Sequence, residues 1–280
     1  MKRLLDIEFH KFRNSKSSKV LTIIYLVIVV ALMFVGLYEL EIKGTKASLS
    51  DLGIFDFPFI WHLSTYLISF LKFLIAIVIV SLVANEYSNR TLKQNLIDGL
   101  SKKELILSKF YFILIFTTIL TALVFLVCLL LGLIYSSITE PNLIFINIEF
   151  IAAFFISHIA FFAMCLFAGV LVKRSAFALG IIGVWGIFEL VIFGISSYLD
   201  LKFGWSVWDL LRDVLPLNSI SNLVVEPFSK VSMVKTGIET LSQSEFEKDY
   251  GVRWINVIVC SVWTTLFTYW SYILLKRRDP

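Results

Sequence analysis

Charged residues are scarce in this sequence of 280 residues. Asp, Glu, Lys and Arg make up 16% of it, whereas 58% is hydrophobic, and the mean hydropathy is +0.86. Soluble domains usually contain about 45–50% apolar and about 25% charged residues. The composition therefore excludes an ordinary soluble domain and indicates an integral membrane protein.

Proline and glycine are also few, with five and 13 copies. This scarcity argues against a low-complexity, disordered chain. The three cysteines, Cys128, Cys165 and Cys260, lie inside apolar runs at no metal-like spacing. We interpret them as small buried residues, which indicate neither a metal site nor a redox compartment.

Patterns for catalysis are lacking as well. The sequence contains neither a G-x-x-x-x-G-K-[ST] phosphate loop nor the H-E-x-x-H pattern of zinc proteases, so we do not expect it to bind ATP in the P-loop manner. The stretch GISS (194–197) resembles half of a serine-protease loop, with His158 as a conceivable base. It lacks a glycine after Ser196. An intramembrane hydrolase is therefore the least favoured function, and we expect no catalytic residue.

Long hydrophobic runs, by contrast, are abundant. Six are long enough to cross a bilayer core of about 30 Å, which needs roughly 17–25 helical residues. The alternation typical of β-barrel strands is absent, so the runs are predicted to be helices. The predicted fold is a single all-α membrane domain, residues 1–280, with spans at 20–38, 62–84, 110–135, 149–172, 176–198 and 254–275.

The distribution of Lys and Arg predicts the orientation of these spans. With a cytoplasmic N-terminus, the segments inside the cell hold 16 Lys and Arg residues and those outside hold eight. Basic residues favour the cytoplasmic side, although a long loop such as 199–253 follows this rule poorly. We expect a multi-pass protein of the inner (cytoplasmic) membrane, with both termini in the cytoplasm and 199–253 outside.

The first 14 residues have the pattern of an amphipathic helix. Leu5, Phe9 and Phe12 share one helical face, and the charged residues lie mostly elsewhere on the wheel. Such a helix suits the inner membrane surface, where basic side chains meet anionic lipid. A simple positively charged anchor for the first span is the alternative.

A polar stretch at 85–109 separates the second span from the third. Asn89 can cap a short helix in which Leu92 and Leu96 share a face, and Gly99 can end it. The pattern predicts a short helix on the cytoplasmic side.

Ser101 and Glu104 then form an S-x-x-E capping box, which predicts the start of a helix that continues into the third span. The whole stretch is therefore predicted to form a short helix, a break and a second helix. Because the cytoplasmic portion is too small to cover its polar faces, we expect a second, soluble protein to dock there.

Short connections and glycines mark the fourth and fifth spans. Only Lys173–Ser175 joins them, which predicts a tight antiparallel hairpin. Gly180, Gly183 and Gly186 recur at every third residue and predict a seam for close helix packing.

The segment after the fifth span contains two helical patterns. Trp205, Trp208 and Leu211 recur at steps of three before Pro216, which is predicted to end that helix. Tryptophans just beyond the outer end of the fifth span favour a helix that lies in the outer membrane interface or dips back into it. A second amphipathic pattern follows at 231–241.

Three polar residues lie near the middles of predicted spans. Lys72, His158 and Glu189 are candidates for a substrate or proton path, because ionisable groups within a membrane often serve function. The structural alternatives are that Lys72 and Glu189 pair, that Lys72 extends to the interface, or that His158 bonds a neighbouring carbonyl.

Residues 85–109 also carry an ordered motif: an acidic residue, a threonine, a polar helix, and a Ser-Lys pair followed by a lysine before the third span. The residues concerned are Glu86, Thr91, Leu92, Ser101, Lys102 and Lys109. With the six spans, this order resembles an ABC-2-type transporter permease, the membrane subunit of an exporter-like ATP-binding-cassette (ABC) system. That family usually has glycine where Arg90 stands and proline where Gly99 stands.

The resemblance implies an N-terminal elbow helix at 1–19, a coupling helix within 85–109 and re-entrant external helices between the last two spans. It implies a complex of two ATPase subunits with two permeases, as a homodimer or heterodimer, in a lipid membrane and without nucleic acid. ATP and Mg would bind the ATPase, and this chain would carry no cofactor or metal. The ATPase-coupling residues implied are Glu86, Arg90, Thr91, Leu92, Lys93, Leu96, Ser101 and Lys102.

The resulting prediction is a permease that exports an unidentified substrate with energy from a separate ATPase. The alternative is a membrane scaffold or sensor that docks a soluble partner without transporting.

Overall fold

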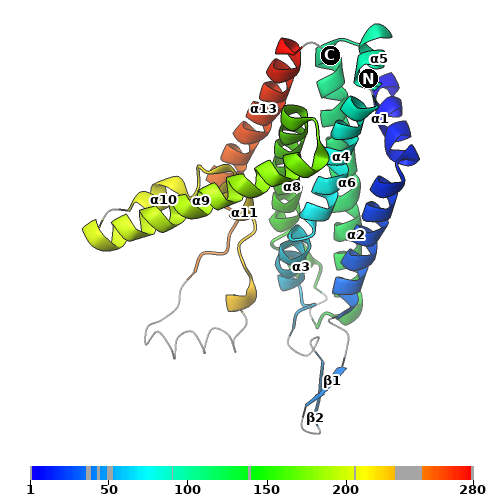
Figure 1. Cartoon of the computed structure of the whole chain (residues 1–280). Coiled ribbons are helices and arrows are strands. Elements are labelled where there is room, and N and C mark those ends of the chain that lie inside the picture. Colours follow the sequence, from blue (N-terminus) through cyan, green and yellow to red (C-terminus); the bar gives the residue numbers. More distant parts are fainter. Residues whose placement is uncertain are drawn as a thin grey trace.

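The structure, a computed structural model, describes residues 2–35, 39–42, 45–48, 53–89, 91–137, 140–204, 206–230 and 248–278. This part of the chain is helical apart from one antiparallel hairpin, in which Glu39 of β1 (Glu39–Ile42) lies opposite Ser48 of β2 (Thr45–Ser48) (Figure 1). The helices are α1 (Lys2–Asn14), α2 (Lys16–Val35), α3 (Phe59–Ser69), α4 (Lys72–Ser88), α5 (Thr91–Ile97), α6 (Lys102–Tyr135), α7 (Pro141–Ile144), α8 (Glu149–Val172), α9 (Ser175–Phe203), α10 (Val207–Leu211), α11 (Pro216–Ser221) and α13 (Trp254–Arg277), with a 3-10 turn η2 (Phe228–Lys230).

Four helices, α6, α8, α9 and α13, are long and apolar enough to cross a membrane, and six spans result if two bent helix pairs each count as one. The bent pairs are α1 with α2, at 84°, and α3 with α4, at 46°. These elements cover the described residues of the six predicted spans, and residues 36–38 of the first span lie outside the described part of the chain. The second predicted span is therefore two helices that meet at an angle.

Hydroxyl side chains near the end of α3 explain the bend in that span. Thr65 Oγ1 donates to Trp61 O at 2.7 Å, and Ser69 Oγ donates to Thr65 O at 2.7 Å. Hydroxyls that bond the carbonyl one turn earlier compete with the backbone and often bend a helix. The break follows at Phe70–Leu71.

Helix α8 forms the centre of the bundle, in contact with α3, α4, α6, α9, α11 and α13. Two thirds of its apolar window, 67%, is buried, against 17% for α9 and for α13. Small residues on α8 allow this close packing, because a methyl group at Gly169 would lie only 3.1 Å from Val83 of α4. The all-round hydrophobicity of α8 thus reflects a helix that is surrounded by other helices.

The predicted break between α5 and α6 is confirmed. Gly99 has a φ of +92°, in the left-handed region that favours glycine. Ser101 is the N-cap of α6, with its Oγ 3.2 Å from the amide of Glu104, and the Glu104 carboxylate accepts from the Ser101 amide at 2.9 Å. At 34 residues, α6 is about 50 Å long, so it extends beyond a bilayer core of about 30 Å.

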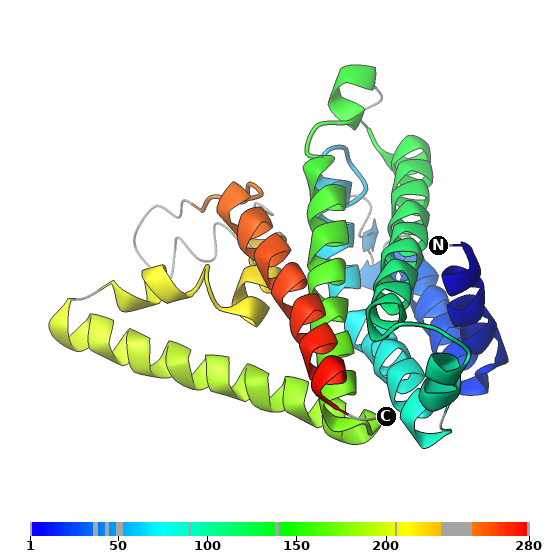
Figure 2. The same ribbon diagram turned by 90° about the horizontal axis from the view of Figure 1, so that it is seen from above.

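The predicted antiparallel hairpin of the fourth and fifth spans is only partly correct. The turn is tight, with a left-handed φ of +62° at Lys173, but α9 then diverges from α8 and extends sideways from the bundle (Figures 1 and 2). Methyl groups at Gly180 or Gly183 would meet no described atom within 4 Å, and one at Gly186 would meet only Leu217. Among the described residues, only Gly186 of the predicted glycine seam therefore lies close to another helix, α11.

One prediction for the segment after α9 changes as well. Pro216 does not end a helix but begins α11, where its missing amide is tolerated at the first position. Trp205 and the pattern at 231–241 lie outside the described residues. Trp208 does lie in a helix, α10, and its ring packs edge-on against Phe193 of α9 at 4.7 Å.

A polar network holds the chain against the end of the bundle that lies opposite both termini. Lys248 Nζ lies 2.6 Å from Glu226 Oε1, Ser229 Oγ donates to that oxygen, and Tyr250 Oη donates to Ser229 Oγ at 2.8 Å. Burial would raise the pKa of Glu226, but the hydrogen bonds from Lys248 and Ser229 hold it below its usual range. His62 of α3 completes the contact, with Nε2 2.7 Å from Val225 O.

Glycine is required at one contact between α6 and the segment that leads into α3. A methyl group at Gly132 would overlap the ring of Phe57, which is 1% exposed. We predict that Gly132→Ala lowers the free energy of unfolding by about 1–3 kcal/mol, because the packed ring must move. Thermal unfolding of the purified protein in detergent measures this.

Gly180→Ala is the matched control, because a methyl group there meets no described atom within 4 Å. It should leave stability unchanged or raise it by about 0.5–1 kcal/mol through helix propensity. Equal melting temperatures for the two variants would contradict the prediction.

Candidate functional site

Four charged side chains from three helices meet at the end of the bundle that holds both termini. Lys11 of α1 lies 2.7 Å from Glu86 of α4 and 3.1 Å from Glu8 of α1. Lys109 of α6 contacts Glu8 at 3.4 Å and also forms an ion pair with Glu86. We call Glu8, Lys11, Glu86 and Lys109 the charge cluster.

The charge cluster is buried and formally neutral. Glu8, Glu86 and Lys109 are 3%, 2% and 4% exposed, and Lys11 closes the outer side. Burial would raise the pKa of Glu8, but Lys109 and Lys11 hold it below its usual range. Each carboxylate contacts both ammonium groups, so removal of any member leaves a buried charge uncompensated.

Aromatic packing seals the cluster from the membrane side. The Phe9 ring of α1 packs edge-on against Phe112 of α6 at 5.1 Å, and Phe12 packs against Phe116 at 5.6 Å. The apolar face predicted for the first 14 residues thus contacts α6. Ser108 Oγ adds a hydrogen bond to Glu8 at 3.2 Å.

Helix α5 lies next to this cluster, and its leucines face inward. Leu92 is 3% exposed and Leu96 packs against the core. These two residues therefore attach α5 to its own chain. Thr91 and Lys93, by contrast, are exposed.

Lys102 connects the start of α6 to the end of α13. Its Nζ donates to Arg278 O at 2.9 Å and to Lys276 O at 3.3 Å. An ammonium group is a favourable partner for the unpaired carbonyls at a helix C-terminus. Arg278 in turn donates to Val170 O of α8 at 2.8 Å. The predicted coupling residue thus joins three helices.

The structure gathers only some of the predicted coupling residues. Glu86 belongs to the charge cluster, Ser101 caps α6, and Lys102 binds the end of α13. Arg90 lies outside the described residues. The coupling role itself stays a prediction.

The intramembrane residues Lys72 and Glu189 do not pair. The Glu189 carboxylate accepts from the amides of Leu217 and Asn218, both at 2.9 Å, and from Trp185 Nε1 at 2.8 Å. It thereby satisfies the first amides of α11, whose N-terminus carries partial positive charge. Glu189 needs no lysine because these donors stabilise its charge.

Lys72 begins α4 at the bend of the second span. Its Nζ lies 5.2 Å from the centre of the Phe161 ring of α8, a cation–π contact. The thiols of Cys165 and Cys260 lie within electrostatic reach. No carboxylate among the described residues forms an ion pair with Lys72, so its participation in a substrate path stays a prediction.

His158 is bonded within its own helix. Its Nδ1 lies 2.8 Å from Phe154 O and 3.3 Å from Ser157 Oγ. The structural alternative, a bond to a neighbouring carbonyl, is confirmed. The other ring nitrogen, Nε2, is buried without a hydrogen-bond partner among the described residues.

Sequence reasoning missed Glu8 and Lys11 as members of a site. One signal was available, because Glu8 lies beside Phe12 and Phe9 on the apolar face of α1. A carboxylate within an apolar stripe needs a buried partner. The sequence could not indicate that this partner comes from α4 and α6.

Long apolar helices, a short helix between two of them and a buried charge cluster beside it indicate a multi-pass membrane protein. Residues 4–189, more than half of the chain, match the family model described as ABC-2 family transporter protein. The chain therefore belongs to the ABC-2 transporter family and is an ABC-transporter permease. A search of curated proteins finds no match.

The charge cluster predicts strong coupling between Lys109 and Glu86. Lys109→Met should lower the stability of the purified protein by about 3–5 kcal/mol, because Glu8 and Glu86 keep buried charges with one counter-ion fewer. Glu86→Gln should also destabilise. The double variant should recover part of the loss, which a double-mutant cycle of thermal unfolding detects.

Lys19→Met is the control, because Lys19 is exposed at the start of α2 and should change stability by less than about 0.5 kcal/mol. Additive losses for Lys109 and Glu86 would show that the two side chains act independently.

Proposed function

We propose that this permease couples ATP hydrolysis by a separate ATPase to movement of a substrate across the membrane, in the direction of export. The observation that carries this proposal is the placement of α5, which lies at the same end of the bundle as both termini (Figure 1). It is joined there to α4 on one side and, through the Gly99 break, to α6 on the other.

The outer face of α5 is suited to contact a soluble protein. Ile97 is 69% exposed, and Thr91, Lys93 and Gln94 are exposed beside it. An exposed aliphatic side chain within a polar surface resembles the apolar anchor of an interface with a polar rim. We therefore assign ATPase docking to this face, in place of the face formed by Leu92 and Leu96.

Two rigid connections would transmit a push on α5 into the bundle. Glu86 lies two residues before the end of α4 and binds Lys11 and Lys109, which joins α4 to α1 and α6. Lys102 joins the start of α6 to the end of α13. A packed element with two discrete arrangements can carry such a signal when ATP binding favours one of them.

The proposed complex contains two ATPase subunits and two permeases, as a homodimer or heterodimer. ATP and Mg would bind the ATPase, since the permease sequence has no phosphate loop. The broad apolar surfaces of α9 and α13, each 17% buried in its apolar window, would contact lipid and the second permease. This arrangement suits an amphipathic substrate.

Co-purification with the ATPase tests the docking face. Ile97→Asp should lower ATPase recovery at least about tenfold, because burying an aliphatic side chain contributes about 1.5–3 kcal/mol and 1.4 kcal/mol is a factor of ten. The amount of inserted permease should not change. Ile146→Asp is the control, because Ile146 is 44% exposed at the opposite end. Full ATPase recovery with Ile97→Asp would exclude this face.

Cysteine labelling tests the proposed orientation in the inner membrane. Ser101→Cys should react with a membrane-impermeant maleimide only after the cells are opened, because the end with both termini should face the cytoplasm. Ser244→Cys, in the segment predicted outside, should react in intact cells. Labelling of Ser101→Cys from outside would reverse the topology.

A further inference from the structure

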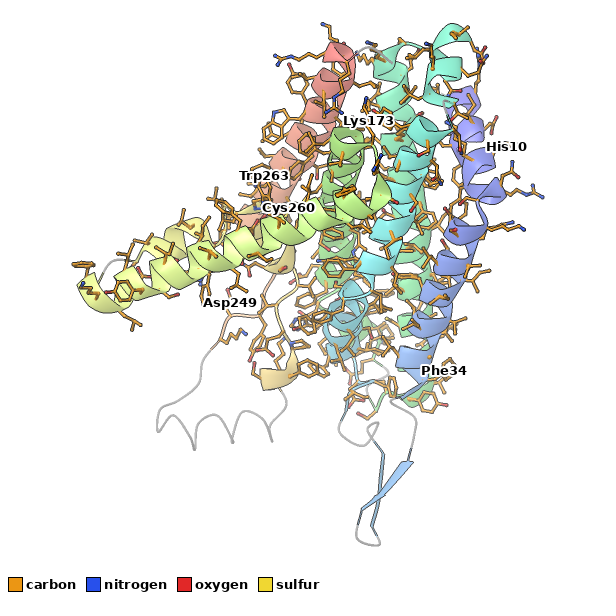
Figure 3. The ribbon with its side chains drawn as sticks, in the orientation of Figure 1. His10, Phe34, Lys173, Asp249, Cys260 and Trp263 are labelled. Carbon is orange, nitrogen blue, oxygen red and sulfur yellow. The ribbon has the colours of Figure 1, made fainter. Side chains whose placement is uncertain are left out.

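A groove of about 300 Å³ runs between α6 and α13 at the end of the bundle that holds both termini. Trp263 and Cys260 of α13, which are labelled in Figure 3, lie farther from that end of the bundle. Its lining residues are Lys103, Ile106, Leu107, Phe110, Thr264, Thr265, Thr268, Tyr269 and Tyr272.

The deep part of the groove is effectively apolar. Thr264, Thr265 and Thr268 each donate their hydroxyl to a carbonyl one turn earlier on α13, at 2.8, 3.0 and 2.8 Å. Their hydroxyl hydrogens are therefore occupied within the helix. Ile106 and Phe110 line the α6 side of the same groove.

The outer part of the groove is positive. Lys103 lies in the first turn of α6 and is exposed, with no ion pair to any described residue. No acidic side chain lines the groove. The nearest carboxylate in sequence, Glu104, is bound to the Ser101 amide and hydroxyl. Lys276 and Arg277 end α13 at the same level.

We propose that this groove binds one anionic phospholipid, with its phosphate at Lys103 and one acyl chain between α6 and α13. Lys103 and Phe110 lie seven positions apart, which is about 10 Å along the helix. This distance matches the descent from a headgroup into the acyl region of a core about 30 Å thick. The volume lies at the lower limit of about 300 Å³ for a ligand site, so it accommodates a single chain.

The lipid would bind both α6 and α13, which Lys102 already connects. It would therefore fill the gap between two helices of the proposed coupling route. Lipid binding is measured on the permease alone, so its failure would leave the proposed ATPase coupling untouched.

Lipid titration by native mass spectrometry tests the proposal, with phosphatidylglycerol and phosphatidylcholine that carry identical acyl chains. The wild-type protein should bind phosphatidylglycerol more tightly. Lys103→Ala should weaken this binding roughly fivefold, as expected for one lysine near an anionic headgroup. It should weaken phosphatidylcholine binding less, because choline carries a positive charge beside the same phosphate. Lys19→Ala is the matched control, because that lysine is also exposed but lies on α2 and does not line the groove.

A second variant tests the acyl part of the site. Thr265→Trp fills the groove and should abolish retention of both lipids at this site. The control is Thr118→Trp, at an exposed position of α6 outside the groove. This variant should retain both lipids, which shows that an added tryptophan does not by itself disrupt folding. Equal affinity of the wild-type protein for the two lipids, or unchanged phosphatidylglycerol binding in Lys103→Ala or Thr265→Trp, would overturn the proposal.

Discussion

Charges that are removed from water must be compensated, and the charge cluster is where this constraint organises the protein. The charge cluster (Glu8, Lys11, Glu86 and Lys109) is neutral as a whole. Loss of any one member would leave a buried, uncompensated charge, which costs free energy. Three helices must therefore stay in register at this point. Since α5 follows directly after Glu86 and α6 begins shortly before Lys109, the proposed docking segment has two fixed ends.

Other polar groups satisfy the same constraint by different means. Glu189 is stabilised by the first amides of α11, Lys72 by an aromatic face, and the last carbonyls of α13 by Lys102. These contacts connect segments at sequence separations that no local pattern spans. Polar groups thus help determine how the helices associate, together with close packing at positions such as Gly132 and Gly169.

The sequence predicted best what depends on neighbours in the chain. Run length located the helices, and four residues sufficed for the Ser101 capping box. The charge cluster could not be predicted, because Lys11 and Glu86 are 75 residues apart and helix faces meet only through packing. The pairing of Lys72 with Glu189 was wrong because backbone amides compensate a carboxylate as well as a lysine does, and composition does not distinguish them.

The three cysteines have a practical consequence. Cys128, Cys165 and Cys260 are each 0% exposed, as free thiols on α6, α8 and α13. A thiol shielded by packing reacts with a reagent only when its surroundings open, so its reaction rate reports the frequency of that opening. The reaction rates of these three native thiols therefore report how often the helices separate during a transport cycle, without an added label.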